Sequence, residues 1–163
     1  MFAATRWKLI CALPFIRQKD RIEKMLVFST GTDKTTAELI RRSVEVVKRF
    51  SSPRCDWMAK INANISFVFV QDAVEKTAII HSFGIVSVHA AYIRQSSPLF
   101  LASMFVLWAA AISNKSNDWS DLRAIESQLE FLARINTAES KAVTDHLTEY
   151  YRQQGILPGK ENV

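Results

Sequence analysis

Apolar positions recur with helical spacing between residues 36 and 50. On a helical wheel they occupy one half-circle, and six charged side chains occupy the other. Thr35 followed by Glu38 has the spacing of a capping box, in which each side chain satisfies a backbone donor of the first turn. Ser51, Ser52 and Pro53 interrupt the pattern. The sequence therefore predicts a helix over 35–50, followed by a linker-like stretch over 53–64.

The segment from 65 to 93 is ambiguous, because periodicity alone does not separate a short buried strand from a buried helix. The run Ile65–Val70 alternates like a strand, but it continues into 71–76 without a turn residue. We therefore expect 65–93 to be mostly helical. Arg94–Pro98 interrupts this segment, and Pro98 opens a further helix over 98–113 that has no charged residue.

A long final helix is predicted from about 121 to 154, with Gly155 ending it and Pro158 beyond. Four apolar residues near its start have 3-4-3 spacing, which is typical of a surface that packs against another helix. We expect this surface to bury against a helix of the same chain or to mediate self-association. Its members are Leu122, Ile125, Leu129 and Leu132.

Together these elements predict an all-α protein of four to five helices in one domain, 1–163. Its parts are a basic amphipathic region (1–60), two apolar helices (61–113), and a long C-terminal helix with a tail (114–163). The 163 residues suffice for one core, and 48% apolar against 23% charged residues excludes intrinsic disorder. Two cysteines far apart provide neither a disulfide framework nor a zinc site.

Charge is distributed unevenly along the chain. Residues 1–60 contain 13 basic and 6 acidic side chains, whereas residues 61–163 contain 8 and 10. Before Asp20 there is no acid, so we expect a basic amphipathic helix over the first 19 residues, with a mitochondrial presequence as the alternative. We see no secretory signal there. A basic first third favours an anionic partner, either lipid headgroups or nucleic acid.

The 35–50 helix places its bases at both margins of the apolar half, where they can extend to lipid phosphates. A surface helix packed on a protein core has the same pattern, and periodicity does not separate the two. The predicted membrane contacts are apolar residues with flanking bases: Leu39, Ile40, Val44, Val47, Phe50, Arg41, Arg42, Lys48 and Arg49.

Both apolar helices are at or below the lower length limit of a membrane-spanning helix. Leu99–Ile112 is about 21 Å long as a helix, against about 30 Å of bilayer core. Thr77–Ile93 is a second stretch without a formal charge, and its histidines and serines lower its hydrophobicity. The two stretches are consistent with a shallow hairpin in a membrane or with the centre of a soluble helical bundle.

No residue pattern indicates catalysis. Gly31–Thr35 lacks the second glycine of a phosphate-binding loop and has Asp33 in its place. His81 and His89 would lie about 12 Å apart on one helix face, too far for one metal ion. We expect these two residues and His146 to be buried or interfacial. The sequence thus predicts no enzyme activity, no metal and no cofactor.

Three residue strings together resemble the peroxin-11 family of peroxisomal membrane proteins. Gly31-Thr-Asp33-Lys34 before an amphipathic helix is similar to the family's glycine–x–aspartate–lysine opening. Phe67-Val-Phe69, continuing through Glu75 to Phe83-Gly84-Ile85, looks like its apolar helix with an acidic end and Gly-Ile. Gly155-Ile156-Leu157 is similar to its Gly-Leu-Leu end. The resemblance covers about residues 20–158, but Arg54–Lys60 only weakly matches the family's basic helix, and members usually continue into another membrane segment.

The resemblance implies a non-enzymatic protein that elongates and divides peroxisomes by inserting amphipathic helices into one leaflet and by self-association. The expected location is the peroxisomal membrane, with the cytoplasm as the alternative. The expected partners are an anionic membrane surface and a second copy or another helical protein. Two other functions stay open: a soluble all-α subunit of a larger assembly, and a basic nucleic-acid-binding bundle, although nucleic acid is the less favoured partner.

Overall fold

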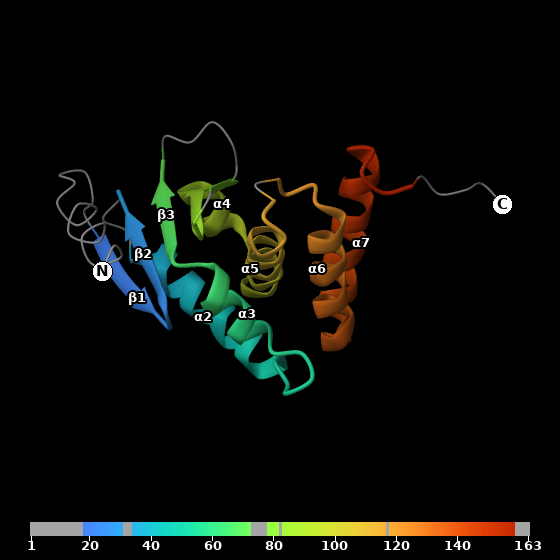
Figure 1. Cartoon of the computed structure of the whole chain (residues 1–163), viewed down its shortest axis with the longest axis horizontal. Coiled ribbons are helices and arrows are strands. Elements are labelled where there is room, and N and C mark those ends of the chain that lie inside the picture. The colour runs from blue at the N-terminus through green and yellow to red at the C-terminus, as the bar shows by residue number, and fades with distance from the viewer. Residues whose placement is uncertain (1–17, 31–33, 73–77, 82, 117, 159–163) are drawn as a thin grey trace.

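The computed structural model describes residues 18–30, 34–72, 78–81, 83–116 and 118–158. Over these ranges the chain is mixed α/β, so the predicted all-α fold class is wrong. Figure 1 shows the sheet at one end, α5 near the centre and α7 toward the other end. The elements are β1 (Gln18–Ile22), β2 (Met25–Ser29), α2 (Thr35–Phe50), α3 (Trp57–Asn64), β3 (Phe67–Gln71), β4 (Ala78–His81), β5 (Ile85–His89), α4 (Ala90–Gln95), α5 (Pro98–Ser113), α6 (Leu122–Ile135) and α7 (Ala138–Gln153).

The five strands form one sheet in the order β1-β2-β3-β5-β4. The three central strands β2, β3 and β5 are parallel, and the edge strands β1 and β4 pair antiparallel with their neighbours. Val27 is in register with Val68, and Val68 with Val86, and all three are buried on the face that the helices cover. In Figure 1 the labelled helices lie to one side of the sheet.

The expected helix over 65–93 is wrong, because β3, β4, β5 and the short helix α4 occupy this segment. β3 lies between two parallel neighbours, and its outward-facing residues Phe67 and Phe69 are apolar and half-buried as well. A strand with two apolar faces gives a continuous apolar run that periodicity does not distinguish from a buried helix.

The turn that the sequence pattern did not reveal lies at Gly84, which connects β4 to β5 with φ +75°. The carbonyl oxygen of Gly84 accepts hydrogen bonds from the backbone N–H groups of Ser66 (2.8 Å) and Phe67 (3.1 Å). This turn is therefore fastened to the start of β3.

The predicted helix over 35–50 is confirmed as α2, but its expected capping box is wrong. Lys34 is the N-cap residue, and its side chain makes no capping hydrogen bond. Ile40, Val44 and Val47 pack into the core that α2 shares with the sheet and α5. The expected linker over 53–64 is also wrong, because Asp56 caps α3 by accepting a hydrogen bond from the Ala59 N–H at 2.8 Å.

The helix predicted over 98–113 is confirmed as α5. Ser97 caps it and Pro98 occupies its first turn. By contrast, the long helix expected over 121–154 is wrong, because the chain forms two helices. Asn136 takes a left-handed conformation (φ 50°) that ends α6, and Thr137 starts α7 through a capping box with Ser140. Gly155, with φ +70°, follows the end of α7 as expected.

None of the described helices combines the length and the apolarity that a membrane span requires. The basic helix expected over the first 19 residues falls almost entirely outside the described residues, and Gln18–Lys19 belong to β1.

We predict that Gly84→Ala lowers the free energy of unfolding by at least about 3 kcal/mol. An alanine at this position would adopt a strained φ, and its Cβ would lie 2.4 Å from the backbone oxygen of Asn64. Urea denaturation followed by circular dichroism measures this loss.

Gly155→Ala is the matched control, since Gly155 has a similar φ but, apart from its two chain neighbours, no described residue lies within 4 Å of the place that an alanine Cβ would occupy. We expect this variant to lose only about 1–2 kcal/mol, the cost of the left-handed conformation alone. Equal losses in the two variants would contradict the close approach of β3 to the Gly84 turn.

Candidate functional site

A cleft of about 560 Å³ opens between the edge strand β4 and the helices α4, α5 and α7. Its walls are mainly aromatic: all three tyrosines of the chain and two of its four tryptophans line it. α4 contributes Tyr92, and the 114–121 connection contributes Trp119. The remaining lining residues are Ala78, Ile80, Phe100, Met104, Leu107, Trp108, His146, Leu147, Tyr150 and Tyr151.

The rings meet one another in two groups. Tyr92 packs edge-on against Phe100 with ring centroids 5.9 Å apart, and the His146 ring lies 6.4 Å from Phe100. Trp119 lies 5.9 Å from Tyr150 and 6.4 Å from Tyr151. Such contacts between rings hold the walls in defined orientations.

A buried hydrogen-bond chain behind the cleft joins α7, α6 and α5. The Tyr151 hydroxyl donates to Gln128 Oε1 at 2.6 Å, and Gln128 Nε2 donates to Ser103 Oγ at 3.1 Å. Ser103 Oγ in turn donates to the Phe100 carbonyl at 2.7 Å. Because Gln128, Ser103 and Tyr151 are buried, losing one partner would leave another without compensation from water. These hydrogen bonds thus fix the ring of Tyr151 in the cleft wall.

The phenol groups of Tyr92 and Tyr151 stay protonated well into alkaline solution. Burial raises the pKa of Tyr92, and the neighbouring phenols of Tyr151 and Tyr150 raise it further. Burial and the nearby Tyr150 also raise the pKa of Tyr151, against a smaller lowering by its hydrogen bond to Gln128. At neutral pH these two side chains therefore present neutral rings and hydroxyls. Among the described contacts, the hydroxyls of Tyr92 and Tyr150 have no hydrogen-bond partner.

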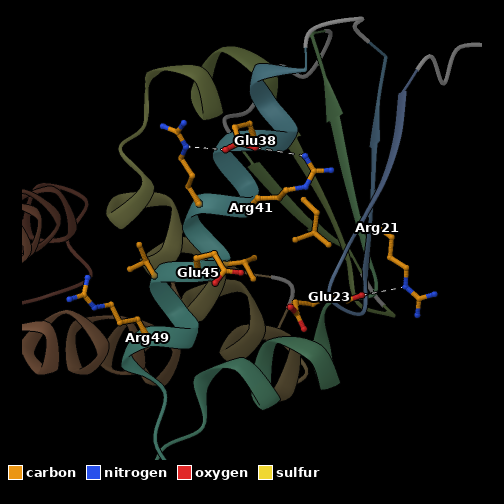
Figure 2. Close-up of a pocket in the computed structure, with 10 residues that line it drawn as sticks. Arg21, Glu23, Glu38, Arg41, Glu45 and Arg49 are labelled. Carbon is orange, nitrogen blue, oxygen red and sulfur yellow. Dashed lines mark hydrogen bonds and ion pairs between the residues drawn. The ribbon is translucent and has the colours of Figure 1, made fainter.

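A second hollow of about 520 Å³, between the β1–β2 turn and α2, is lined by charged side chains of both signs. Glu38 pairs with Arg41 at 3.9 Å and with Arg42 at 3.1 Å, and Figure 2 shows Glu38 beside Arg41. Arg49 and Arg21 lie on opposite sides of this view and do not point toward each other. Arg41 and Arg42 pair with acidic neighbours, and Arg21 and Arg49 lie apart, so the described side chains of this groove form no convergent cationic site.

The bases predicted to contact lipid lie in this groove or beside it. Arg41 pairs with Asp20 at 2.6 Å, and Lys48 pairs with Glu45 at 2.9 Å and with Glu23. Hydrogen bonds to Glu23 and Glu45 raise the pKa of Lys48. Arg49 has its guanidinium 5.8 Å from the ring centroid of Phe50. Three of the four bases therefore already have acidic partners.

The predicted apolar contacts are divided between the core and its margin. Ile40, Val44 and Val47 are buried, whereas Leu39 and Phe50 are half-buried at the edge of the core. This is the arrangement of a helix packed on a protein core.

The predicted self-association surface is divided in the same way. Ile125 and Leu132 are buried inside the chain, Leu129 is half-buried and Leu122 is 53% exposed. The structure therefore does not leave these four residues on one free surface.

The histidines do not share a helix face. His81 on β4 and His146 on α7 are exposed rather than buried, and His89 is half-buried on β5; an interfacial role for them stays a prediction. His81 Nε2 lies 2.9 Å from Ser87 Oγ. Over the described ranges, no three histidine, cysteine, aspartate or glutamate side chains gather as metal ligands. Residues 31–33 of the rejected phosphate-loop motif lie outside the described residues.

Sequence reasoning missed the cleft entirely. Its residues come from 78–80, 92–108, 119 and 146–151, and no short motif connects them. The available signal was compositional: every tyrosine of the chain lies after residue 90, two of them adjacent. That signal gains meaning only when the fold brings α4, α5 and α7 together.

We predict that Tyr92 and Tyr151 remain un-ionised in the folded protein at about pH 11, because burial penalises the phenolate. The double variant Tyr92→Phe/Tyr151→Phe should then have the same tyrosinate absorbance at about 295 nm as the native chain while both stay folded. Lower absorbance in the variant would contradict burial of these phenols.

The same groups make stability depend on pH. In the unfolded chain they ionise near the ordinary tyrosine value of 10.0, whereas in the folded chain they ionise only at higher pH. Their contribution is therefore complete below pH 10.0 and falls above it, by up to about 1.4 kcal/mol per pH unit for each group. The double variant should show a flatter decline in urea denaturation.

We also predict that Gln128→Leu lowers the free energy of unfolding by about 1–3 kcal/mol, because the Tyr151 hydroxyl and Ser103 lose a buried partner. Gln153→Leu is the control, since exposed Gln153 donates only to exposed Glu149. We expect that control to change stability by less than about 0.5 kcal/mol. Similar losses in both variants would show that the buried hydrogen bonds of Gln128 contribute no more to the free energy of unfolding than an exposed one does.

No family model, no curated protein and no solved structure matches this chain, so the candidate site is defined by its own geometry.

Proposed function

We propose that this chain is a binding protein whose cleft between β4, α4, α5 and α7 holds a small, mostly apolar ligand. The observation that carries the proposal is the convergence of six aromatic side chains from four separate segments on one hollow. They are Tyr92, Phe100, Trp108, Trp119, Tyr150 and Tyr151.

Size and polarity both support this function. Ligand pockets are usually about 300–1,000 Å³ and are lined by apolar side chains with a few polar groups. The cleft, at about 560 Å³, lies in that range. Its polar groups are the phenols and the imidazole of His146, and the hydroxyls of Tyr92 and Tyr150 are available for a ligand among the described contacts. An apolar body with one or two hydrogen-bonding groups fits such a wall.

Membrane remodelling at the peroxisome stays a prediction, as do self-association and an anionic lipid partner. The wedge hypothesis needs the apolar half of α2 to enter a lipid surface. Ile40, Val44 and Val47 of that half are at most 1% exposed, so α2 would have to leave the core first. Burying each such side chain contributes about 1.5–3 kcal/mol, which opposes that release. This cost is why we favour the cleft as the site of function.

We predict that the neutral, apolar dye N-phenyl-1-naphthylamine binds the folded chain saturably, with an increase in its fluorescence. Ala78→Phe should weaken this binding at least about tenfold, because Ala78 lines the cleft from the edge strand β4 and a larger ring would fill it. Fluorescence titration measures the dissociation constant, and circular dichroism confirms that the variant is folded.

Ala133→Phe is the matched control, since Ala133 is exposed on α6 and does not line the cleft. It should leave the dissociation constant unchanged. The proposal fails if the native chain shows no saturable binding, or if a folded Ala78→Phe variant binds the dye as tightly as the native chain does.

A further inference from the structure

The electrostatics around the aromatic cleft favour positive over negative ligands. No lysine, arginine, aspartate or glutamate of the described residues lines it, so an anion would find no fixed positive charge there. The segment 118–158, which supplies its outer wall, contains seven acidic and four basic residues. This part of the chain therefore has the opposite sign to the basic residues 1–60.

Acidic side chains adjoin the lining residues of this wall in the sequence. Asp118 precedes Trp119, Asp145 precedes His146 and Glu149 precedes Tyr150, and all three acidic residues are exposed. We define Asp118, Asp145 and Glu149 as the acidic rim. One base, Arg152, adjoins the lining residue Tyr151 in the same way, so the three acidic side chains outnumber the single basic one. A cation approaching from this side meets a negative potential before it reaches the rings.

The rings themselves are suited to a cation that needs few hydrogen bonds. Tryptophan and tyrosine faces carry negative electrostatic potential and attract cations within about 6 Å of the ring centre. A primary ammonium or a metal ion would lose strong hydration on entering and would find few acceptors in return. A methylated ammonium is weakly hydrated, and its charge is spread over methyl groups that pack against rings.

We propose that the cleft binds an organic cation bearing a methylated ammonium group, held against the accessible rings of Trp119 and Tyr150 and attracted by the acidic rim. This inference rests on the proposed function of the cleft as a ligand site, and it names the class of ligand. The cation–π attraction supplies specificity, and the apolar walls supply the rest of the contact area.

Choline and its neutral carbon isostere, 3,3-dimethylbutan-1-ol, separate charge from shape. Both have a hydroxyl and a head of the same size, but only choline is charged. In calorimetric titrations of the full-length chain, choline should bind at least about tenfold more tightly than the alcohol. Raising the salt concentration should weaken choline binding and leave binding of the alcohol unchanged, because salt screens the acidic rim.

Variants distinguish the ring face from the hydroxyl. Tyr150 is 41% exposed, so its replacement is compatible with folding. Tyr150→Leu should weaken choline binding at least about fivefold, whereas Tyr150→Phe keeps the ring and should bind choline almost as the native chain does. Asp145→Asn/Glu149→Gln should weaken choline binding and leave the alcohol unaffected. Phe83→Leu, in the β4–β5 turn away from the cleft lining, should change neither.

The outcomes separate this inference from the proposed function. If the alcohol or N-phenyl-1-naphthylamine binds in the cleft and choline binds no more tightly than the alcohol, the cation inference is overturned and the apolar ligand site stands. If none of the three probes binds, both proposals fail. Equal choline binding by Tyr150→Leu and the native chain also overturns the cation inference, because the ring face would then contribute nothing.

Discussion

Helix α5 has to be kept out of water, and the other elements are arranged around this requirement. It has no charged residue, and ten of its sixteen residues are buried. Such a helix is stable in water only if other elements surround it, and α2, α3 and α6 pack against it. Phe105, Trp108 and Leu107 lie among the least exposed residues of the chain. The two-sided arrangement of a sheet with helices at one end and α6 and α7 at the other follows from enclosing α5 (Figure 1).

The aromatic cleft lies where that enclosure is incomplete. Phe100 and Met104, one turn apart on α5, are only half-buried, and they face the hollow between β4 and α7. The hydrogen-bond chain from Tyr151 through Gln128 to Ser103 holds α7 against α6 and α5 behind this hollow. One helix thus has two roles: most of its surface forms the core, and its first three turns contribute a wall of the candidate site.

The basic and the acidic regions of the sequence occupy different parts of the fold. On α2, two arginines and the single lysine pair with acids of the helix or with Asp20 and Glu23, so the basic excess of the first third is partly neutralised where α2 lies (Figure 2). Exposed pairs of this kind contribute little to stability, about 0–1 kcal/mol each. The acidic excess lies with the wall formed by α7 and the 114–121 connection, and the proposed preference of the cleft for positive ligands rests on this difference in sign.

Local patterns were enough to define α2 and α5, because an amphipathic half-circle and an uncharged run between Pro98 and Asn114 can be recognised without knowing their neighbours. The same holds for the ending at Gly155. The strands within 65–93 could be recognised only from long-range contacts. β3 is apolar on both faces because it lies between two parallel strands, and the local sequence pattern does not identify these neighbours. The break at Asn136 depends on a left-handed residue and on α7 folding back beside α6. The cleft was equally beyond local reasoning, because Tyr92, Trp119 and Tyr150 are distant in the chain and become neighbours only when α5 is enclosed.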